Sequence, residues 1–341
     1  METKHAVALV GLGKISDAHL QGWREAKEVQ VKIVVDTDGA RAGAKAREYG
    51  VPEFGTDFQA VLERQDIDIV DLAIPHFLHA PYSIAALKAG KHVLVEKPVA
   101  TKLSDAEEMI KTAESTGKKL MVAEPIRFSP SHRRAARMIE QGEVGDPFLF
   151  NTRAQFYVPP QRFQGTNTGW RSEAGKIGGG VLLESGIHNI ATATFLMGDV
   201  ESVVAFKGKQ TRSEITVEDT ISVLFRFESG ATGHGSFSWA ARWSDYTDDF
   251  TVFGTEGVLG NRPRTGRIFL DKGKGEVREW VETQVAAGKS EEIKHFLDCI
   301  DNDKTPVTSA AEETKNLKVV LAAYLSATEN RPVKIEELKA N

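Results

Sequence analysis

Five short apolar runs, separated by helical segments, constrain the fold of the first 123 residues more than any other feature. The runs cover residues 6–10, 29–35, 67–74, 92–95 and 119–123. They are largely continuous rather than alternating, which is typical of strands buried on both faces. Helical patterns fill residues 16–26, 41–49, 81–89 and 104–115. This alternation predicts a doubly wound parallel sheet over residues 1–123.

Two of the predicted helices carry recognisable end signals. Gly90 follows the helix over residues 81–89, where a C-terminal glycine belongs. Ser104 is predicted to cap the helix that reaches Ser115, with Glu107 three residues later completing a capping box.

The first strand-to-helix turn is rich in glycine. Glycines mark many tight turns that bind no ligand, but this string follows a strand and opens a helix, where free backbone N–H groups face an anion. Gly11 permits the tight turn, Gly13 lets the backbone approach a pyrophosphate, and Ser16 takes the third small position. The sequence therefore predicts a dinucleotide site at Gly11, Gly13, Lys14, Ile15 and Ser16.

Asp36 ends the second predicted strand, at about the spacing of 20 residues where an acid accepts the ribose hydroxyls of a dinucleotide. Without the glycines, an exposed turn carboxylate would be the better interpretation. A carboxylate at this position repels the 2′-phosphate of NADP, so NAD is the expected cofactor. Arg41 lies near enough in the sequence to leave NADP open.

The pattern changes after Ala123. Strands with period-two alternation begin at Val203, and residues 220–228 show it best, with one apolar face formed by Ile221, Val223, Phe225 and Phe227. The pattern predicts an α+β domain over residues 124–341 with a large open, mostly antiparallel sheet. The outer face of this sheet, small and polar, is expected to be solvated or covered by another subunit.

Three segments contain candidate catalytic residues. Lys97 follows Glu96 at the carboxyl end of a strand, where α/β sheets bind ligands, and its ammonium could stabilise a developing oxyanion. Glu184 and His188 are four residues apart and would share a face of a helix beginning near Val181. Histidine is a natural base near neutral pH, although a solvated lysine and a packed histidine are the commoner cases.

Arg127 lies at the junction of the two predicted domains, where it would contact substrate or tie the junction together. Aromatic side chains that could stack on a ligand lie at residues 156–163, at Trp170 beside Arg171, and at residues 239–243. Core packing explains aromatic residues more often than ligands do.

The composition of the chain indicates which kinds of binding partner to expect. The net charge is −5 without a basic run, which argues against nucleic acid. No apolar run is long enough for a membrane span or a secretory signal. The single cysteine, Cys299, cannot form an intramolecular disulfide. These features predict a cytoplasmic protein with no nucleic-acid or membrane partner. The substrate is expected to be a small molecule, and no metal site is expected.

Together these motifs resemble the glucose–fructose oxidoreductase and inositol dehydrogenase family. The resemblance rests on the glycine string, Asp36, the Pro75-to-His79 stretch, residues 89–98 and the segment from Gly178 to His188. It continues through residues 218–220, 253–257 and 306–309, and so spans nearly the whole chain.

The resemblance implies an NAD(P)-dependent dehydrogenase or reductase that moves hydride between nicotinamide and a secondary alcohol or ketone of a sugar, cyclitol or related carbohydrate. It implies that Lys97 contacts the reacting oxygen and that His188 exchanges its proton. Glu184 stands where the family usually has aspartate. Pro75, His79, Glu96 and Lys97 would line the cofactor, and the expected substrate contacts are Lys97, Arg127, Trp170, Arg171, Glu184 and His188.

Many members of that family are dimers or tetramers, so the resemblance also implies a homodimer or homotetramer built through the open sheet. Two other functions stay open on the same resemblance. One is an NAD-dependent glycosidase, and the other is a non-catalytic dinucleotide-binding regulator.

Overall fold

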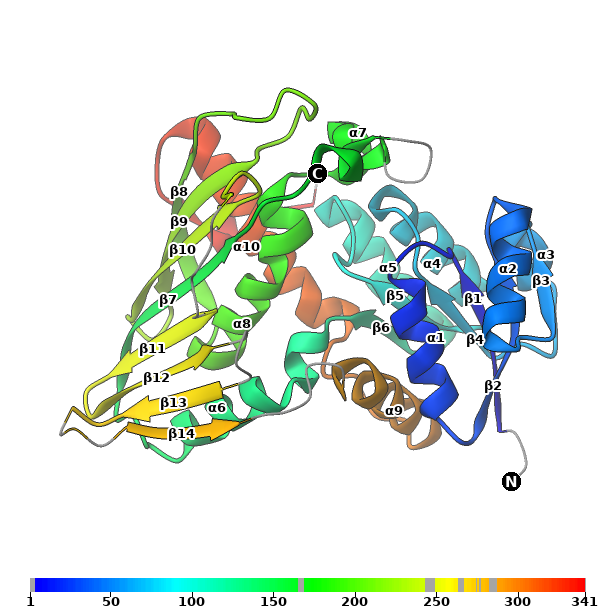
Figure 1. Cartoon of the computed structure of the whole chain (residues 1–341), viewed down its shortest axis with the longest axis horizontal. Helices are drawn as coiled ribbons and strands as arrows, with labels where there is room; N and C mark the ends of the chain where they lie inside the picture. Colours follow the sequence, from blue (N-terminus) through cyan, green and yellow to red (C-terminus); the bar gives the residue numbers. More distant parts are fainter. Residues whose placement is uncertain are drawn as a thin grey trace. The chain divides into compact units, whose positions relative to one another are not determined.

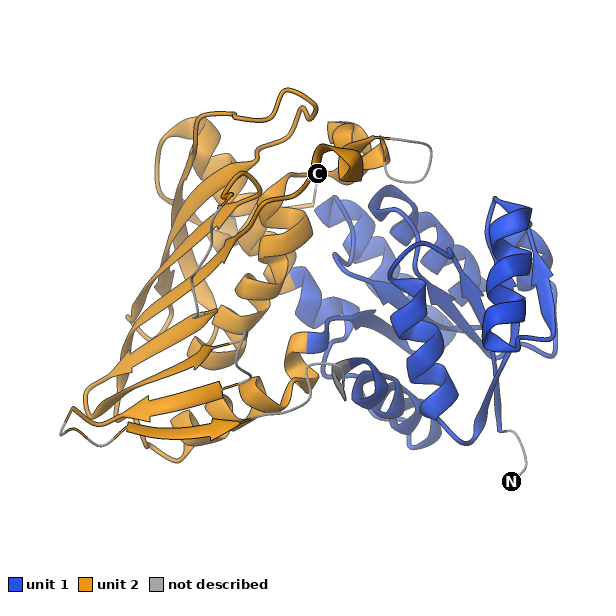
Figure 2. Ribbon diagram, viewed as in Figure 1, with its two compact units in different colours: residues 1–125, 286–314 blue, residues 126–285, 315–341 orange. Residues whose placement is uncertain are grey.

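The computed structural model describes residues 4–164, 169–242, 249–262, 267–273, 275, 277–281 and 287–340. The chain forms two compact units (Figure 2). Residues 1–125 and 286–314 make up unit 1, and residues 126–285 and 315–341 make up unit 2.

Unit 1 contains a six-stranded sheet in the order β3-β2-β1-β4-β5-β6 (Figure 1). Every pairing in it is parallel, as the sequence predicts. The strands are β1 (His5–Val10), β2 (Val29–Val35), β3 (Glu53–Gly55), β4 (Ile69–Leu72), β5 (His92–Glu96) and β6 (Leu120–Ala123).

The helices of unit 1 match the predicted segments with two differences. The prediction that Ser104 caps the fourth helix is wrong, because α5 begins at Leu103 and the preceding Lys102 makes no side-chain cap. The short elements β3 and α3 escape prediction because five residues or fewer carry no readable periodicity. The helices are α1 (Ser16–Glu25), α2 (Gly39–Tyr49), α3 (Phe58–Leu62), α4 (His79–Lys88), α5 (Leu103–Thr116) and α9 (Ala287–Asp301).

Helix α9 returns from late in the chain to pack on α1. Gly22 of α1 makes this approach close, since a Cβ there would lie 2.7 Å from the Ile293 side chain. By compactness residues 286–314 therefore group with unit 1, whereas the sequence-based division assigned all of residues 124–341 to the second domain. That division stays a proposal about functional domains.

Unit 2 contains a nine-stranded sheet in the order β14-β13-β12-β11-β7-β10-β9-β8-β15. Only β7 and β10 pair in parallel among the described strands, so the predicted mostly antiparallel sheet is confirmed. The strands are β7 (Pro147–Gln155), β8 (Val200–Lys207), β9 (Thr220–Phe227), β10 (Thr232–Ser238), β11 (Phe250–Gly254), β12 (Gly257–Arg262), β13 (Arg267–Asp271), β14 (Val277–Val281) and β15 (Val333–Lys334).

Helices cover one face of this sheet and leave the other open (Figure 1). The predicted apolar face of β9 is buried, while the alternating residues Ser222, Leu224 and Arg226 are exposed. The outer face is not only small and polar as predicted, because Leu224 and Phe206 expose 53% and 60% of their surface. The helices are α6 (Pro130–Glu140), α7 (Ala174–Ile177), α8 (Ile187–Met197) and α10 (Ala310–Glu329), which begins in unit 1.

None of the helices in the described ranges is long and apolar enough to cross a membrane.

Candidate active site

The glycine turn after β1 is shaped by close backbone packing. Gly11 has φ +90°, and a Cβ on it would lie 2.4 Å from the carbonyl oxygen of Ala73. A side chain at this position would therefore clash with the neighbouring strand end. A Cβ on Gly13 would meet nothing within 4 Å, so the backbone there is open to a ligand.

The start of α1 offers hydrogen-bond donors. The Ser16 amide and hydroxyl both donate to the Gly13 carbonyl, at 3.0 and 2.7 Å. The described residues give no acceptor to the amides of Gly13, Lys14 and Ile15. Such amides at a helix N-terminus suit a pyrophosphate. The turn thus fits the dinucleotide predicted from the sequence.

Asp36 is held at the end of β2 by several contacts. Its Oδ2 accepts a hydrogen bond from the Leu12 amide at 2.8 Å, which ties it to the glycine turn. The Arg41 guanidinium donates to both carboxylate oxygens at 3.0 and 3.1 Å. The carboxylate therefore lies beside the glycine turn, and Arg41 forms its ion pair.

Glu96, at the end of β5, is a buried carboxylate with partners on three segments. Its Oε2 accepts from the Lys97 amide at 3.2 Å. Its Oε1 accepts from His19 Nε2 at 2.8 Å and lies 3.2 Å from the Lys289 ammonium. The backbone entering Lys97 is thus anchored to α1 and α9.

The contacts of Glu96 extend into a buried charge network. His19 Nδ1 lies 2.8 Å from an Asp71 oxygen, the Trp23 indole donates to Asp71 at 2.6 Å, and Lys289 pairs with Glu292 at 2.7 Å. Burial would lower the pKa of His19, but the Asp71 charge and hydrogen bonds from Asp71 and Glu96 raise it to about 9. His19 is therefore cationic at neutral pH.

Burial and neighbouring charges also act in opposite directions on the pKa values of Glu96 and Glu292. Burial would raise the pKa of Glu96, but the Lys289 and His19 charges hold it well below its usual range. Burial raises the pKa of Glu292 to about 7, against the opposing effect of Lys289. Two cationic side chains, His19 and Lys289, thus lie among three carboxyl groups in this network.

His79 and Pro75 shape the backbone beside this network. The two ring nitrogens of His79 lie 2.7 and 2.9 Å from the carbonyl oxygens of Pro98 and Ile74. The ring is fully buried, so it fixes both turns by contacts to the main chain. The Pro75 carbonyl accepts from the Leu78 amide at 2.9 Å.

In unit 2, a buried carboxylate fixes the segment that carries Glu184 and His188. Glu218 accepts from the amides of Gly180 and Leu182 at 2.8 and 3.1 Å, and from the Tyr324 hydroxyl at 2.8 Å. A Cβ on Gly180 would lie 1.9 Å from the Glu218 carbonyl oxygen. Glycine is therefore required where this segment approaches the Glu218 backbone.

The prediction of one continuous α-helix from Val181 is wrong. A π-helical turn spans Leu182–Gly186, and α8 begins only at Ile187. Glu184 and His188 thus do not have the regular i, i+4 relationship of an α-helix.

Glu184 is enclosed by arginines. Its Oε1 accepts from Arg162 Nη2 at 3.0 Å and from Arg171 Nε at 2.7 Å. The Arg171 guanidinium lies over the Trp170 ring, 4.1 Å from its centroid. Glu184 and the adjacent pair Trp170 and Arg171 were separate candidates in the sequence, and the structure brings them together.

His188 lies in the first turn of α8, next to an acidic group. Burial raises the pKa of Asp249, while a hydrogen bond from Asn189 and the nearby charge of His188 oppose the rise. The Asn189 amide donates to Asp249 at 2.9 Å. The Asn189 side chain therefore ties the first turn of α8 to Asp249.

The remaining candidates have structural contacts. The Arg127 guanidinium lies over the Phe195 ring at 4.3 Å, within unit 2. Trp239 and Phe163 are buried against one another, with ring centroids 5.3 Å apart, which indicates core packing. Trp243, at the end of the third aromatic stretch, lies outside the described residues.

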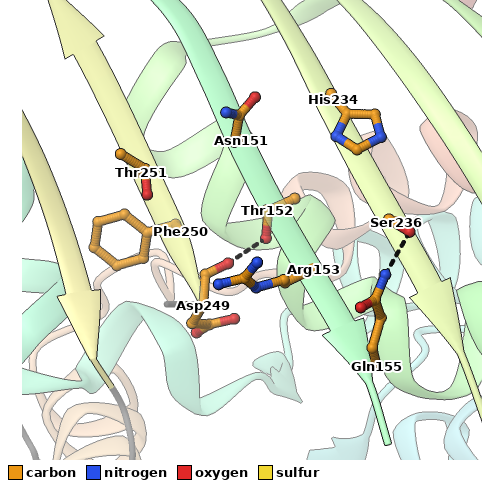
Figure 3. Close-up of a pocket in the computed structure, with 9 residues that line it drawn as sticks. All are labelled: Asn151, Thr152, Arg153, Gln155, His234, Ser236, Asp249, Phe250 and Thr251. Carbon is orange, nitrogen blue, oxygen red and sulfur yellow. Dashed lines mark hydrogen bonds between the residues drawn. The ribbon is translucent and has the colours of Figure 1, made fainter. Parts of the chain in front are cut away.

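A separate hollow of about 360 Å³ lies on the sheet of unit 2 (Figure 3). The Gln155 amide donates to Ser236 at 2.7 Å there, and the Thr152 hydroxyl donates to the Asp249 carbonyl at 2.8 Å. Neither Glu184 nor His188 lines it. The lining residues are Asn151, Thr152, Arg153, Gln155, His234, Ser236, Asp249, Phe250 and Thr251.

Sequence reasoning missed several residues around the candidates. Asp71 was visible as a carboxylate inside an apolar strand, which is a signal for a buried partner. Lys289 and Arg162 carried no local signal, because their partners lie far away in the sequence. The missed residues are His19, Asp71, Arg162, Asp249, Lys289, Glu292 and Tyr324, and Glu218 was noted only as part of the family motif.

Comparison with known proteins agrees with the fold and the dinucleotide turn. Residues 5–124 match the oxidoreductase family with an NAD-binding Rossmann fold, and residues 132–260 match the GFO/IDH/MocA C-terminal domain. D-apiose dehydrogenase of Paraburkholderia graminis is 29% identical, over 98% of this chain and 90% of its own.

Two further proteins are similar over nearly their full length. The scyllo-inositol 2-dehydrogenase (NAD(+)) of Bacillus subtilis is 28% identical, over 100% of this chain and 99% of its own. The structure of aldose-aldose oxidoreductase from Caulobacter crescentus superposes with a TM-score of 0.87 at 26% identity, covering 97% of this chain and 99% of that one. With both of its characteristic domains matched in order, this chain belongs to the GFO/IDH/MocA family of NAD-binding oxidoreductases.

Proposed function

We propose that this oxidoreductase transfers hydride between nicotinamide and a secondary alcohol or ketone of a sugar, cyclitol or related carbohydrate. The observation that carries the proposal is the glycine turn, whose open amides lie beside Asp36, on the same unit as Lys97. The relatives named above, dehydrogenases of D-apiose and scyllo-inositol, support the substrate class.

The turn from Gly11 to Ser16 would hold the pyrophosphate of the cofactor, and Asp36 its adenosine ribose. Pro75, Glu96 and Lys97 would lie along the nicotinamide half, and the bound cofactor supplies the hydride acceptor. His79 would act through the turns that it fixes. Arg41, which pairs with Asp36, keeps use of NADP within the same proposal.

Lys97 and His188 have distinct roles in this proposal. The Lys97 ammonium donates a hydrogen bond to the reacting oxygen and stabilises the negative charge that develops there. The His188 imidazole accepts the proton of the substrate hydroxyl. The other proposed substrate contacts are Arg127, Trp170 and Arg171, and Glu184 acts through Arg171, whose Nε donates to its carboxylate.

A homo-oligomer formed through the open sheet is part of the proposal. Leu224 and Phe206 expose apolar surface on the outer face, which a second copy of the chain would cover. A cytoplasmic location is also proposed, since the one cysteine, Cys299, is buried and free.

The direct test is formation of reduced nicotinamide by the purified protein with NAD or NADP and a panel of aldoses, inositols and methyl glycosides. Lys97→Ala is expected to reduce kcat about 100-fold while the Kd for NAD stays unchanged. Lys102→Ala, which removes an exposed lysine from the same region, is the matched control. Full turnover in Lys97→Ala would refute the assigned role.

The same panel separates the alternatives. A glycosidase would hydrolyse the methyl glycosides without net reduction of the cofactor. A regulator would bind NAD and turn over nothing.

A further inference from the structure

In the cluster formed by Glu184, Arg162 and Arg171, the carboxylate is buried and the two guanidinium groups are more exposed. The Glu184 side chain is 4% exposed, whereas the side chains of Arg162 and Arg171 are 44% and 21% exposed. Its Oε2 has essentially no solvent-accessible surface. A molecule that approaches this cluster therefore meets guanidinium N–H groups before it meets the carboxylate.

This arrangement disfavours Glu184 as the acceptor of a substrate hydroxyl. Oε1 already accepts from two guanidinium groups, at 2.7 and 3.0 Å. The side chain that the resemblance assigned to substrate instead holds two arginines in place. The arginines are the groups presented to a ligand.

The charges of the cluster do not cancel. Among the described side chains of this cluster, two guanidinium groups share one carboxylate oxygen, so these three residues together carry one more positive than negative charge. A single arginine neutralises a carboxylate through a two-pronged contact, so the second arginine is not needed for that purpose. An anion bound beside the cluster would balance the excess charge.

Arg171 has the geometry to receive such an anion. It uses Nε for Glu184, and among the described residues its Nη1 and Nη2 have no hydrogen-bond acceptor. Its plane lies over the Trp170 ring at 4.1 Å, which limits its rotation. A planar guanidinium held in this way matches the two oxygens of a carboxylate.

We propose that Arg171 and Arg162 form a subsite for a substrate carboxylate, so that the preferred substrates are sugar acids rather than neutral sugars. The inference rests on the proposed function and narrows its substrate class. A singly charged carboxylate fits the single excess charge better than a dianionic phosphate does.

The test compares each sugar with its own acid: glucose with gluconate and glucuronate, and galactose with galacturonate. Wild-type kcat/KM is expected to be at least about 10-fold higher for the acids, the scale of one charged hydrogen bond. Arg171→Met should abolish this preference, because it lowers kcat/KM for the acids more than kcat/KM for the neutral sugars. Arg171→Lys keeps the positive charge but lacks the planar guanidinium donors. It should therefore restore part of the preference for the acids.

Two controls keep the result specific. Arg331→Met removes an arginine that is ion-paired with Glu329 and Glu337, and it should leave the preference unchanged. Arg162→Met should also weaken the preference for the acids. It provides a second test if Arg171→Met does not fold.

The outcomes separate this inference from the proposed function. Equal rates for neutral sugars and acids would overturn the subsite and leave the oxidoreductase proposal standing. Higher kcat/KM for glucose 6-phosphate than for the acids would overturn the carboxylate assignment. If no sugar is turned over, calorimetric binding of glucuronate to the NAD-loaded protein decides, and equal Kd values for wild type and Arg171→Met would refute the subsite.

Discussion

The ammonium of Lys289 lies 3.2 Å from a carboxylate oxygen of Glu96, although 193 residues separate the two in the chain. Lys289 also pairs with Glu292 at 2.7 Å, and both carboxylates are nearly or fully buried. An ion pair in such a position contributes mainly by leaving no buried charge without its counterion.

Lys289→Met should therefore lower the free energy of unfolding by about 3 kcal/mol, because two buried carboxylates would lose a shared cation. Lys294→Met on the same helix removes a surface pair with Glu291 and should cost less than about 0.5 kcal/mol. Urea denaturation followed by circular dichroism measures both variants. Equal losses would contradict the importance given to the buried pair.

Stability should fall as the pH rises above neutrality because of His19. Its pKa in the folded protein is raised from 6.5 to about 9. Its stabilising contribution is complete below pH 6.5 and is lost as the pH rises through 9, by roughly 3 kcal/mol. Urea titrations between these limits should show a flatter slope for His19→Gln than for the wild type.

The exposed His234 on β10 provides the control for that experiment. His234→Gln should keep the wild-type slope. If His19→Gln keeps it as well, the loss of stability comes from other groups.

Gly180→Ala should destabilise unit 2, since the new Cβ would lie 1.9 Å from a backbone oxygen of Glu218. The cost of such overpacking is about 3 kcal/mol, at the upper end of the usual range. Gly175→Ala is the matched control, because a Cβ there meets nothing within 4 Å and alanine favours the short helix α7. Thermal unfolding of both variants should show a lower Tm only for Gly180→Ala.

Cofactor preference should depend on Asp36. Asp36→Ala removes the proposed ribose acceptor and leaves Arg41 without this partner, so a 2′-phosphate is no longer repelled. The ratio of kcat/KM for NAD to that for NADP should drop by about 10-fold or more, the scale of a charged hydrogen bond. Asp57→Ala, which removes the cap of α3, should leave the ratio unchanged. An unaltered ratio in Asp36→Ala would place the ribose elsewhere.

Much of the fold was predictable because it depends on local patterns. The buried strands of unit 1 read as apolar runs, and β9 reads as an alternation whose inner residues are buried. The capping box predicted at Ser104 does not form, because the helix begins one residue earlier and has no side-chain cap. The π-helical turn at Leu182–Gly186 could not be anticipated, because Glu218 and Tyr324 hold its amides from distant parts of the chain.

In the candidate site, too, only the features that depend on local sequence could be predicted. Gly11 and Asp36 can be recognised from their spacing in the sequence, because the dinucleotide turn is a local structure. Arg162 and Lys289 acquire their significance only from partners that folding brings near, so no pattern in the sequence marks them. Glu184 illustrates the result: its residue type was noted, but its enclosure by two arginines changes the ligand it favours.

The return of α9 to unit 1 has a consequence for synthesis on the ribosome. The strands that carry Asp71 and Glu96 emerge early, together with His19, but the cation that completes their network is encoded far downstream. At ordinary elongation rates that lysine is made roughly 10–30 s after the last strand of its sheet. Unit 1 therefore cannot reach its final charge balance until most of the chain has been synthesised.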